Sequence, residues 1–360
     1  DAASAINPDV MIFLAGMFVI GEAMRESGYL FHLFNRIFCR AKNLDQLLLL
    51  ILFAMGFLSA LLMNDTLAII GTPLMLYLAQ ALRISPKLLL LTLAFAVTTG
   101  SAMSPIGNPQ NLLIAINGSL TNPFLVFFQY LFIPTVANLV LAYLLLRLFY
   151  KSQFQQTAIE IPKECISDPT LANISRISII LLLILILAKV LAVIVQSSQH
   201  FSLTYIAIFS ALPVILFSSR RWEIMKHIDW CTLVFFAAMF VLMDSVWRSG
   251  FFQSMMEESS LGFGSIPVIL ALSVFLSQII SNVPFVALFQ PLLINPSARD
   301  LMALAAGSTI AGNLFILGAA SNVIIIQNAE KSGETLTFLD FARVGVPLTA
   351  LNVFVYWIFL

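Results

Sequence analysis

Four groups of polar residues that could bind an ion or a small anion lie inside long apolar stretches of this sequence. Asparagine and serine oxygens suit a hard cation such as sodium, whereas the free N–H groups of a restarting helix suit an anion. Asp65 is the only charge in the run 47–82, and a carboxylate at membrane depth is a functional candidate because it is costly to bury. The candidates form two half-sites: Asn64, Asp65, Thr66, Gly107, Asn108 and Asn111 in the first, and Ser281, Asn282, Val283, Gly318, Ser321 and Asn322 in the second.

Each candidate also has a simpler interpretation as a helix cap, because Asn, Ser and Asp side chains commonly satisfy the first N–H groups of a helix. Asp65 has three alternatives: it ligates a cation, carries a proton or caps the following helix. For a bound sodium ion, which is the only cofactor the sequence suggests, the expected positions are Asn64, Asp65, Gly107, Asn282 and Gly318.

The composition is that of a membrane protein. Hydrophobic residues make up 60% of the 360 residues, charged residues only 10%, and there are 31 Phe. Soluble globular domains are far less apolar, so we expect an all-α polytopic membrane protein. The sequence contains no phosphate-binding loop, dinucleotide fingerprint, zinc-protease motif or nucleophile elbow. We therefore expect neither an enzyme nor an ATP-driven pump, and no nucleic-acid partner.

Two apolar runs are interrupted by a short polar turn, at 63–66 and at 281–284. The arms of the second run, about 15 and 11 residues, are too short to cross a bilayer, which needs about 20 residues. A re-entrant hairpin is therefore predicted for 266–294. The first run, 47–82, fits either a hairpin or two short spans, and its likeness to the second favours a hairpin.

Two further runs contain residues that break a helix. Ser104 to Asn111 includes two prolines and a glycine within 88–116, and Gly318 to Asn322 interrupts 301–328. Each is predicted to be a transmembrane helix that stops inside the bilayer and restarts. Ordinary spans are expected at 9–24, 124–150, 177–195, 203–217, 229–246 and 341–360.

The sequence contains an internal repeat. Ala15 to Val19 matches Ala237 to Val241, Phe57 to Ser59 matches Phe275 to Ser277, and Asn64 then falls on Asn282. Gly107 and Asn111 likewise fall on Gly318 and Asn322, whereas Val283 replaces Asp65. Two repeats, 1–150 and 176–360, are therefore predicted on either side of a linker at 151–175. The spans at 177–217 have no counterpart before 9, so about two leading helices are expected to be missing from the first repeat.

The basic residues indicate how the repeats insert. A cytoplasmic linker places all but three of the 18 Lys and Arg inside, the exceptions being Lys189, Arg248 and Arg299, in agreement with the positive-inside rule. On this assignment the first hairpin opens inward and the second outward, so the repeats have inverted topology. Inverted halves with broken helices are typical of secondary transporters.

At these motifs the chain resembles the ion transporter superfamily, which includes citrate and dicarboxylate transporters, arsenite permeases and some sodium/proton antiporters. The matching features are Asn64-Asp65-Thr66, Pro105 to Asn111, Ser281 to Pro284 and Gly312 to Asn322. Sodium-coupled dicarboxylate members have Ser-Asn-Thr at both tips, whereas the Asn-Asp tip here is more similar to the arsenite-permease and citrate-permease branches. The resemblance implies a homodimer that works by elevator-like motion.

The predicted function is secondary active transport of a small anion or oxyanion, such as a carboxylate, a citrate-like anion or arsenite, driven by sodium or protons. The alternative is a sodium/proton antiporter. The expected location is the inner membrane of a bacterium or archaeon, with the lipid bilayer as the surrounding partner.

Overall fold

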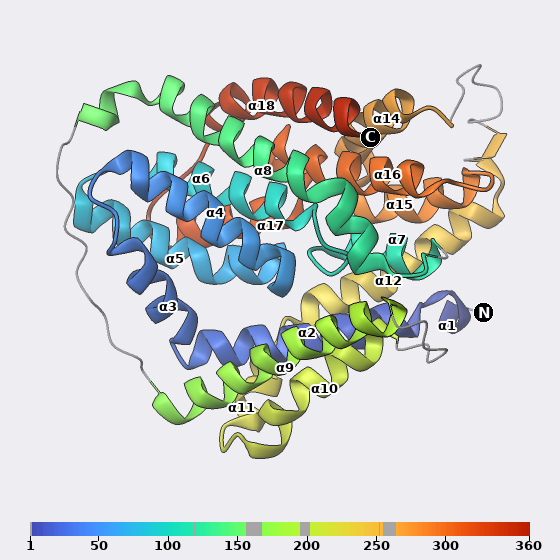
Figure 1. Cartoon of the computed structure of the whole chain (residues 1–360), viewed down its shortest axis with the longest axis horizontal. Coiled ribbons are helices and arrows are strands. Elements are labelled where there is room, and N and C mark those ends of the chain that lie inside the picture. Colours follow the sequence, from blue (N-terminus) through green and yellow to red (C-terminus); the bar gives the residue numbers. More distant parts are fainter. Residues whose placement is uncertain (1, 119, 156–167, 195–201, 252, 255–263) are drawn as a thin grey trace.

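The computed structural model of the chain describes residues 2–118, 120–155, 168–194, 202–251, 253–254 and 264–360 (Figure 1). Within these ranges all regular structure is helical, and six helices are long and apolar enough to cross a membrane. The expected all-α membrane protein is confirmed.

The helices follow the order that the repeat predicts. The first half contains α1 (Ala2–Ala5), α2 (Pro8–Glu26), α3 (Tyr29–Phe38), α4 (Leu44–Leu62), α5 (Asn64–Leu82), α6 (Pro86–Ser101), α7 (Pro109–Asn117), α8 (Pro123–Phe149) and the turn η1 (Lys151–Gln155). The second contains α9 (Pro169–Ile194), α10 (Leu203–Phe217), α11 (Arg221–His227), α12 (Trp230–Arg248), α14 (Ile266–Ile280), α15 (Asn282–Phe289), η2 (Gln290–Leu292), α16 (Ala298–Ile310), η3 (Ala311–Asn313), η4 (Ile316–Gly318), α17 (Ala320–Lys331) and α18 (Phe338–Phe359).

Both interrupted runs are helical hairpins, and both turn at a single residue. Met63 (φ 71°, ψ 143°) separates α4 from α5, and Ser281 (φ 69°, ψ 161°) separates α14 from α15. Positive φ is unfavourable for residues with a side chain, so the same backbone geometry at two matched positions is informative. The arms of the second hairpin, with 15 residues in α14 and with α15 continued by η2, have the expected lengths.

Both predicted helix breaks are present, but the second begins at Ala311 and ends before Ala320, earlier than the predicted Gly318 to Asn322. α6 ends at Ser101 and α7 begins at Pro109, whereas α16 passes through η3 and η4 before α17 begins at Ala320. The residues before α7 and α17 have similar extended backbones, with Asn108 at φ −157° and Ala319 at φ −148°. The likeness between the halves therefore extends to backbone conformation, although their opposite insertion stays a prediction.

The two ends of the molecule differ in charge. α2 ends and α4 begins at the end that carries Arg25, Arg83, Lys87 and Arg147, which we call the basic end; it lies at the left of Figure 1. The first hairpin enters from the basic end, and α14 and α15 enter from the opposite end, where the N-terminus lies (Figure 1).

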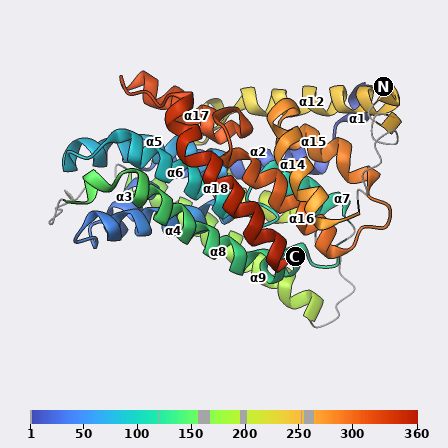
Figure 2. The ribbon, with the colours of Figure 1, turned by 90° about the horizontal axis from the view of Figure 1, so that it is seen from above.

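The helices form two groups that meet along a boundary. α2, α9, α10 and α12, which we call the side layer, lie below α4–α8 and α14–α18 in Figure 1, and we call the latter group the main bundle. In the side layer α10 packs on α2 and α9; in the main bundle α4 packs on α6, α14 on α16 and α18 on α8, the last pair also visible in Figure 2. The main bundle holds both hairpins and both breaks, so it holds all the predicted site residues.

Close approach of glycines fixes the first hairpin on the first broken helix. A methyl group on Gly100 of α6 would lie 2.2 Å from the carbonyl oxygen of Gly56 in α4. Small residues at helix crossings allow backbones to approach in this way in membranes. The crossing holds the α4–α5 tip against the end of α6, where that helix breaks.

The predicted start of one membrane-spanning helix is wrong. The helix expected to begin at 177 begins at Pro169, because the Asp168 carboxylate accepts a hydrogen bond from the Leu171 N–H (3.0 Å) and caps an earlier start. The polar residues 168–176 concealed this start, since the prediction followed the apolar pattern. The central part of the expected linker, 156–167, lies outside the described residues.

Candidate functional site

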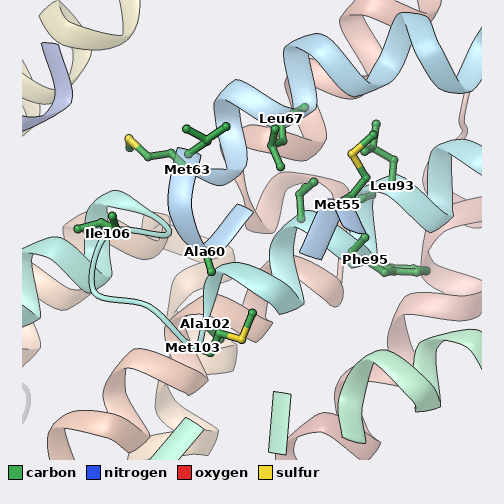
Figure 3. Packing of buried hydrophobic residues seen from close by; sticks show 14 of the residues in the cluster. Met55, Ala60, Met63, Leu67, Leu93, Phe95, Ala102, Met103 and Ile106 are labelled. Atoms are coloured by element: carbon green, nitrogen blue, oxygen red, sulfur yellow. The ribbon is translucent and has the colours of Figure 1, made fainter. Parts of the chain in front are cut away.

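The tip of the first hairpin contacts both broken helices. The Asn64 N–H donates to the Gly107 carbonyl (2.9 Å), and the Asn64 side-chain amide donates to the Ser321 hydroxyl (3.3 Å). Figure 3 shows Met63 at this tip together with the α6–α7 loop that carries Ile106. Asn64 therefore joins the two predicted half-sites, although it is separated from Ser321 by 257 positions in the chain.

A polar network supports the first break, and in it the side-chain amides and oxygens of Asn108 and Asn111 are all hydrogen-bonded. The Asn108 side chain caps α7 by accepting from the Asn111 N–H (2.9 Å), and its amide donates to the hydroxyls of Ser101 (3.0 Å) and Thr309 (3.1 Å). The Asn111 amide donates to the carbonyls of Ser101 (3.2 Å) and Ser104 (3.1 Å), and its oxygen accepts from the Thr309 hydroxyl (3.3 Å). Asn108 and Asn111 therefore hold the loop in shape rather than face a cavity.

The second break repeats part of this network and leaves oxygens unused. The Asn322 amide donates to the Gly312 carbonyl (2.6 Å), as Asn111 does to the matched Ser101. Among the described residues, however, the side-chain oxygens of Asn322, Thr98 and Asn282 have no hydrogen-bond partner. All three residues are buried, so a cation or water would satisfy these atoms, as it would the unpaired side-chain oxygen of Gln278 beside Gly318.

The two glycines of the breaks are required by close packing. A methyl group at Gly107 would lie 2.3 Å from the Ser101 carbonyl oxygen, and one at Gly318 would lie 2.5 Å from the Ala311 carbonyl oxygen. Both obstacles are backbone atoms, which cannot rotate away. The matched glycines therefore act through the shape of the breaks.

A cavity of about 30 Å³ lies where the hairpin tips and broken helices meet. Its walls include the first residues of four helices: Asn64 of α5, Pro109 of α7, Asn282 of α15 and Ala320 of α17. Helix N-termini carry unpaired N–H groups and a partial positive charge, so four of them around one point favour negative charge there. The volume suits one or two waters or a dehydrated ion, because one water needs about 10–15 Å³ by this measure.

Asp65 supplies negative charge to this cavity. Its side chain is 5% exposed and lines the cavity with Ser281 and Val283. No hydrogen bond or ion pair of its carboxylate is found in the part of the chain that the structure describes. Asp65 is therefore a buried carboxylate beside four helix N-termini and is available to a proton or a cation.

A larger cavity of about 520 Å³ lies between the side layer and the main bundle and extends toward the basic end. It is lined by Thr66 next to the first tip, by Arg25, Lys226 and His227, and by the Gln327 amide. We call it the vestibule. Of the twelve predicted site residues only Thr66 lines it, whereas Asn64, Asp65, Ser281, Asn282 and Val283 line the small cavity.

Carboxylates and arginines pair at the rim of the vestibule. Arg25 bonds Glu22 and Glu26 (2.6 Å each), and Arg220 bonds Glu26 and Glu223 (2.7 Å each). Pairing with Arg220 lowers the pKa of the Glu223 carboxyl. Glu22, Glu26 and His227 bring ligand atoms within 4.8 Å of one another, but a metal ion there would have to displace arginines from both carboxylates.

Sequence reasoning missed several side chains of the site, among them that of Gln110, which lines the small cavity. Phe235 and Phe236 of α12 line the small cavity, and Thr98 and Thr309 lie at the breaks. The aromatic residues gave no signal in a chain with 31 Phe. The threonines did give a sequence signal, because each lies nine residues before a glycine of the breaks, Thr98 before Gly107 and Thr309 before Gly318.

Comparison with known proteins gives a consistent result. A family model described as citrate transporter (CitMHS) matches residues 1–300. A 46 kDa membrane protein of Mycobacterium leprae is 25% identical and covers 99% of this chain and 86% of its own length. An uncharacterized transporter of Mycobacterium tuberculosis is 27% identical over 97% of this chain and 85% of that protein. The crystal structure of the Alcanivorax borkumensis YdaH transporter has a TM-score of 0.60 at 14% identity, covering 96% of this chain and 83% of that one, which shows a shared fold.

Proposed function

The chain belongs to the citrate transporter family, and from this premise we propose that it is a secondary active transporter of a small anion, driven by sodium or protons. The superfamily resemblance stated from the motifs is confirmed by this membership, as is the integral membrane location. The observation that supports an anionic substrate is that four helix N-termini meet at one cavity.

Asp65 provides a way to couple the anion to a cation. Its carboxylate lies in the same positive field that an anionic substrate would use, so the two negative charges compete. A proton or a sodium ion on Asp65 removes this competition. The unpartnered oxygens of Asn282 and Asn322 add ligands for sodium on the second half-site.

The substrate is expected to enter through the vestibule. Lys226 and His227 on its wall suit an anion, whereas Arg25 is paired with Glu22 and Glu26, and Asp229 adds a negative charge to the same wall. Thr66 connects the vestibule with the first tip. A citrate-sized anion does not fit in about 30 Å³, so the tips must separate when it binds. Alternating access therefore combines the opening of the small cavity with closure of the vestibule. A homodimer and a bacterial or archaeal inner membrane remain part of the proposal.

A sodium/proton antiporter is the second candidate. Of the described residues that line the small cavity, none is Lys or Arg, and Asp65 is a charged group without a counterion. In an antiporter, sodium and protons would exchange on Asp65 and no organic anion would move.

Flux into proteoliposomes distinguishes the two functions. The screen offers citrate, dicarboxylates, sulfate, phosphate and arsenite with a sodium gradient, a proton gradient or neither. The proposal expects gradient-dependent accumulation of at least one anion. Cation exchange without movement of any anion would replace it with the antiporter.

Two matched variants connect this flux with the site. Asn64→Ala and Asn282→Ala should each abolish accumulation while the protein stays folded. In the described structure the Asn64 side chain makes two hydrogen bonds, worth about 0.5–1.5 kcal/mol each, and the Asn282 side-chain oxygen makes none. Asn122→Ala is the control, because Asn122 caps α8 through the Leu125 N–H (3.2 Å) away from the site. Normal transport in both site variants would show that neither amide takes part in transport.

A further inference from the structure

An apolar groove of about 400 Å³ lies on the boundary between the side layer and the main bundle, and it is separate from the ion site. We propose that it binds an acyl chain of a membrane phospholipid, with the lipid phosphate close to Lys189. The groove has walls from α4, α8 and α9 and a floor from the loop between α6 and α7.

The floor and the rim of the groove differ in exposure. Ala60 and Met103 on the floor are each 7% exposed, whereas Phe128 on the rim is 55% exposed. Figure 3 shows Ala60 at the end of α4 and Met103 in the loop that follows α6. The groove is therefore a recess of buried apolar side chains whose mouth faces outward from the membrane-spanning helices.

The groove lies within one leaflet of a bilayer, because its lining on α8 runs from Phe124 to Phe132, about 12 Å of helix, and one leaflet of the hydrocarbon core is about 15 Å thick. Its floor lies beside the first hairpin tip, which both helices reach from the basic end, and Phe124 lies at the opposite end, where α8 begins. The groove thus runs from the middle of the molecule toward the end opposite the basic one. An acyl chain of the leaflet at that end has the length and direction to enter it.

The lining favours an acyl chain over a protein segment. Of the described residues that line the groove, only Ser104 has a polar side chain, and its hydroxyl accepts from the Ile106 N–H (3.3 Å). A peptide in this groove would leave its own N–H and C=O groups without partners, which costs several kcal/mol per group in an apolar environment. An acyl chain carries no such groups.

Lys189 supplies charge complementarity at the mouth. It lies on α9 between Ile186 and Val190, both of which line the groove, and its side chain is partly buried. α9 ends at Ile194, about 7 Å further along the helix at 1.5 Å per residue. A lysine at this depth can extend its ammonium group toward the headgroups, within reach of a lipid phosphate.

The bound chain would touch the loop that shapes the ion site. Met103 and Pro105 line the groove, and Gly107, whose carbonyl holds the Asn64 N–H, follows two residues later. A phospholipid there supports the break in α6–α7 from the membrane side.

Tryptophan substitution on α9 tests the site. Ile186→Trp fills the groove, whereas Leu187→Trp places the same side chain on the neighbouring, exposed position outside it. Native mass spectrometry of protein purified in mild detergent should find one phospholipid on the wild type and on Leu187→Trp. Its occupancy should fall about tenfold in Ile186→Trp, which corresponds to 1.4 kcal/mol of binding free energy. Equal occupancy in the two variants, or no phospholipid on the wild type, would overturn the proposal.

A photoreactive lipid identifies the occupant. Phosphatidylglycerol with a diazirine in its acyl chain should label peptides that contain Met103 or Phe128, and a tenfold excess of unlabelled lipid should compete. Cross-links from these peptides to a second copy of the chain would overturn the proposal in favour of a protein interface. Lys189→Gln should lower phospholipid occupancy about fivefold, for the roughly 1 kcal/mol that one lysine contributes near a membrane surface, and Lys189→Arg should retain it. Unchanged occupancy in Lys189→Gln would remove Lys189 from the site.

Discussion

More side-chain oxygens lack a hydrogen-bond partner around the second helix break than around the first. Asn111 and Thr309 bond each other at the first break, whereas the matched Asn322 and Thr98 both keep oxygens without a partner in the described structure. Burying a polar atom without a partner costs about 1–3 kcal/mol, so natural proteins retain such atoms where a ligand or water uses them. The second half-site is therefore the better candidate for a cation, and the first for a fixed support.

A pair of threonine substitutions tests this difference. Thr309→Val removes bonds to Asn108 and Asn111, so it should lower the free energy of unfolding by about 1–3 kcal/mol. Thr98→Val removes only an unpaired hydroxyl and should leave the unfolding free energy within about 0.5 kcal/mol, while weakening the sodium dependence of transport. Thermal unfolding in detergent and sodium titration of flux measure the two effects. Equal loss of unfolding free energy in both variants would show that the two threonine hydroxyls stabilise their helix breaks equally, and would contradict the difference between the half-sites.

At the scale of elements, the sequence predicted both hairpins and both breaks because each places polar or helix-breaking residues at membrane depth. It placed the turns within one residue, at Met63 and Ser281. The start of α9 was misplaced because Asp168 caps it within a polar stretch. Contacts such as that of Asn64 with Ser321 had no local pattern, since the interacting residues are far apart in the chain.

The shape of the broken helices depends on their glycines. Gly107→Ala and Gly318→Ala each place a methyl group against a carbonyl oxygen, so each should lower the free energy of unfolding by about 1–3 kcal/mol and abolish transport. Gly264→Ala is the control, because a methyl group there meets nothing within 4 Å. Thermal unfolding and flux are measured together. A stable, active Gly107→Ala protein would show that the loop moves away from this geometry.

For the whole molecule, the boundary between the side layer and the main bundle is the central feature. The vestibule, the small cavity and the apolar groove all lie along it. Composition and charge bias predicted a polytopic membrane protein and its basic end. The boundary itself could not be predicted, because it depends on which apolar faces pack together, and apolar helices in a membrane protein look alike in sequence.

Side-specific labelling tests the inverted halves. Arg83 follows the first hairpin at the basic end, and Arg299 follows the second at the other end. Cysteines that replace them should react with a membrane-impermeant maleimide from opposite sides, Arg83→Cys from the cytoplasm and Arg299→Cys from outside. The three native cysteines, Cys39, Cys165 and Cys231, are first replaced by serine. Labelling of both positions from the same side would contradict the inverted topology and the entry of the two hairpins from opposite sides of the membrane.

The central claim is that Asp65 and the transported anion compete for the positive ends of four helices, and that a cation relieves the competition. The most direct measurement is uptake by Asp65→Asn proteoliposomes of the anion that the wild type accumulates best, with a sodium gradient, a proton gradient or neither. The amide keeps the shape of the carboxylate and is permanently neutral. The account predicts that this variant loses accumulation under both gradients but retains downhill exchange of the anion. Accumulation equal to that of the wild type under either gradient would contradict it and remove Asp65 from the coupling mechanism.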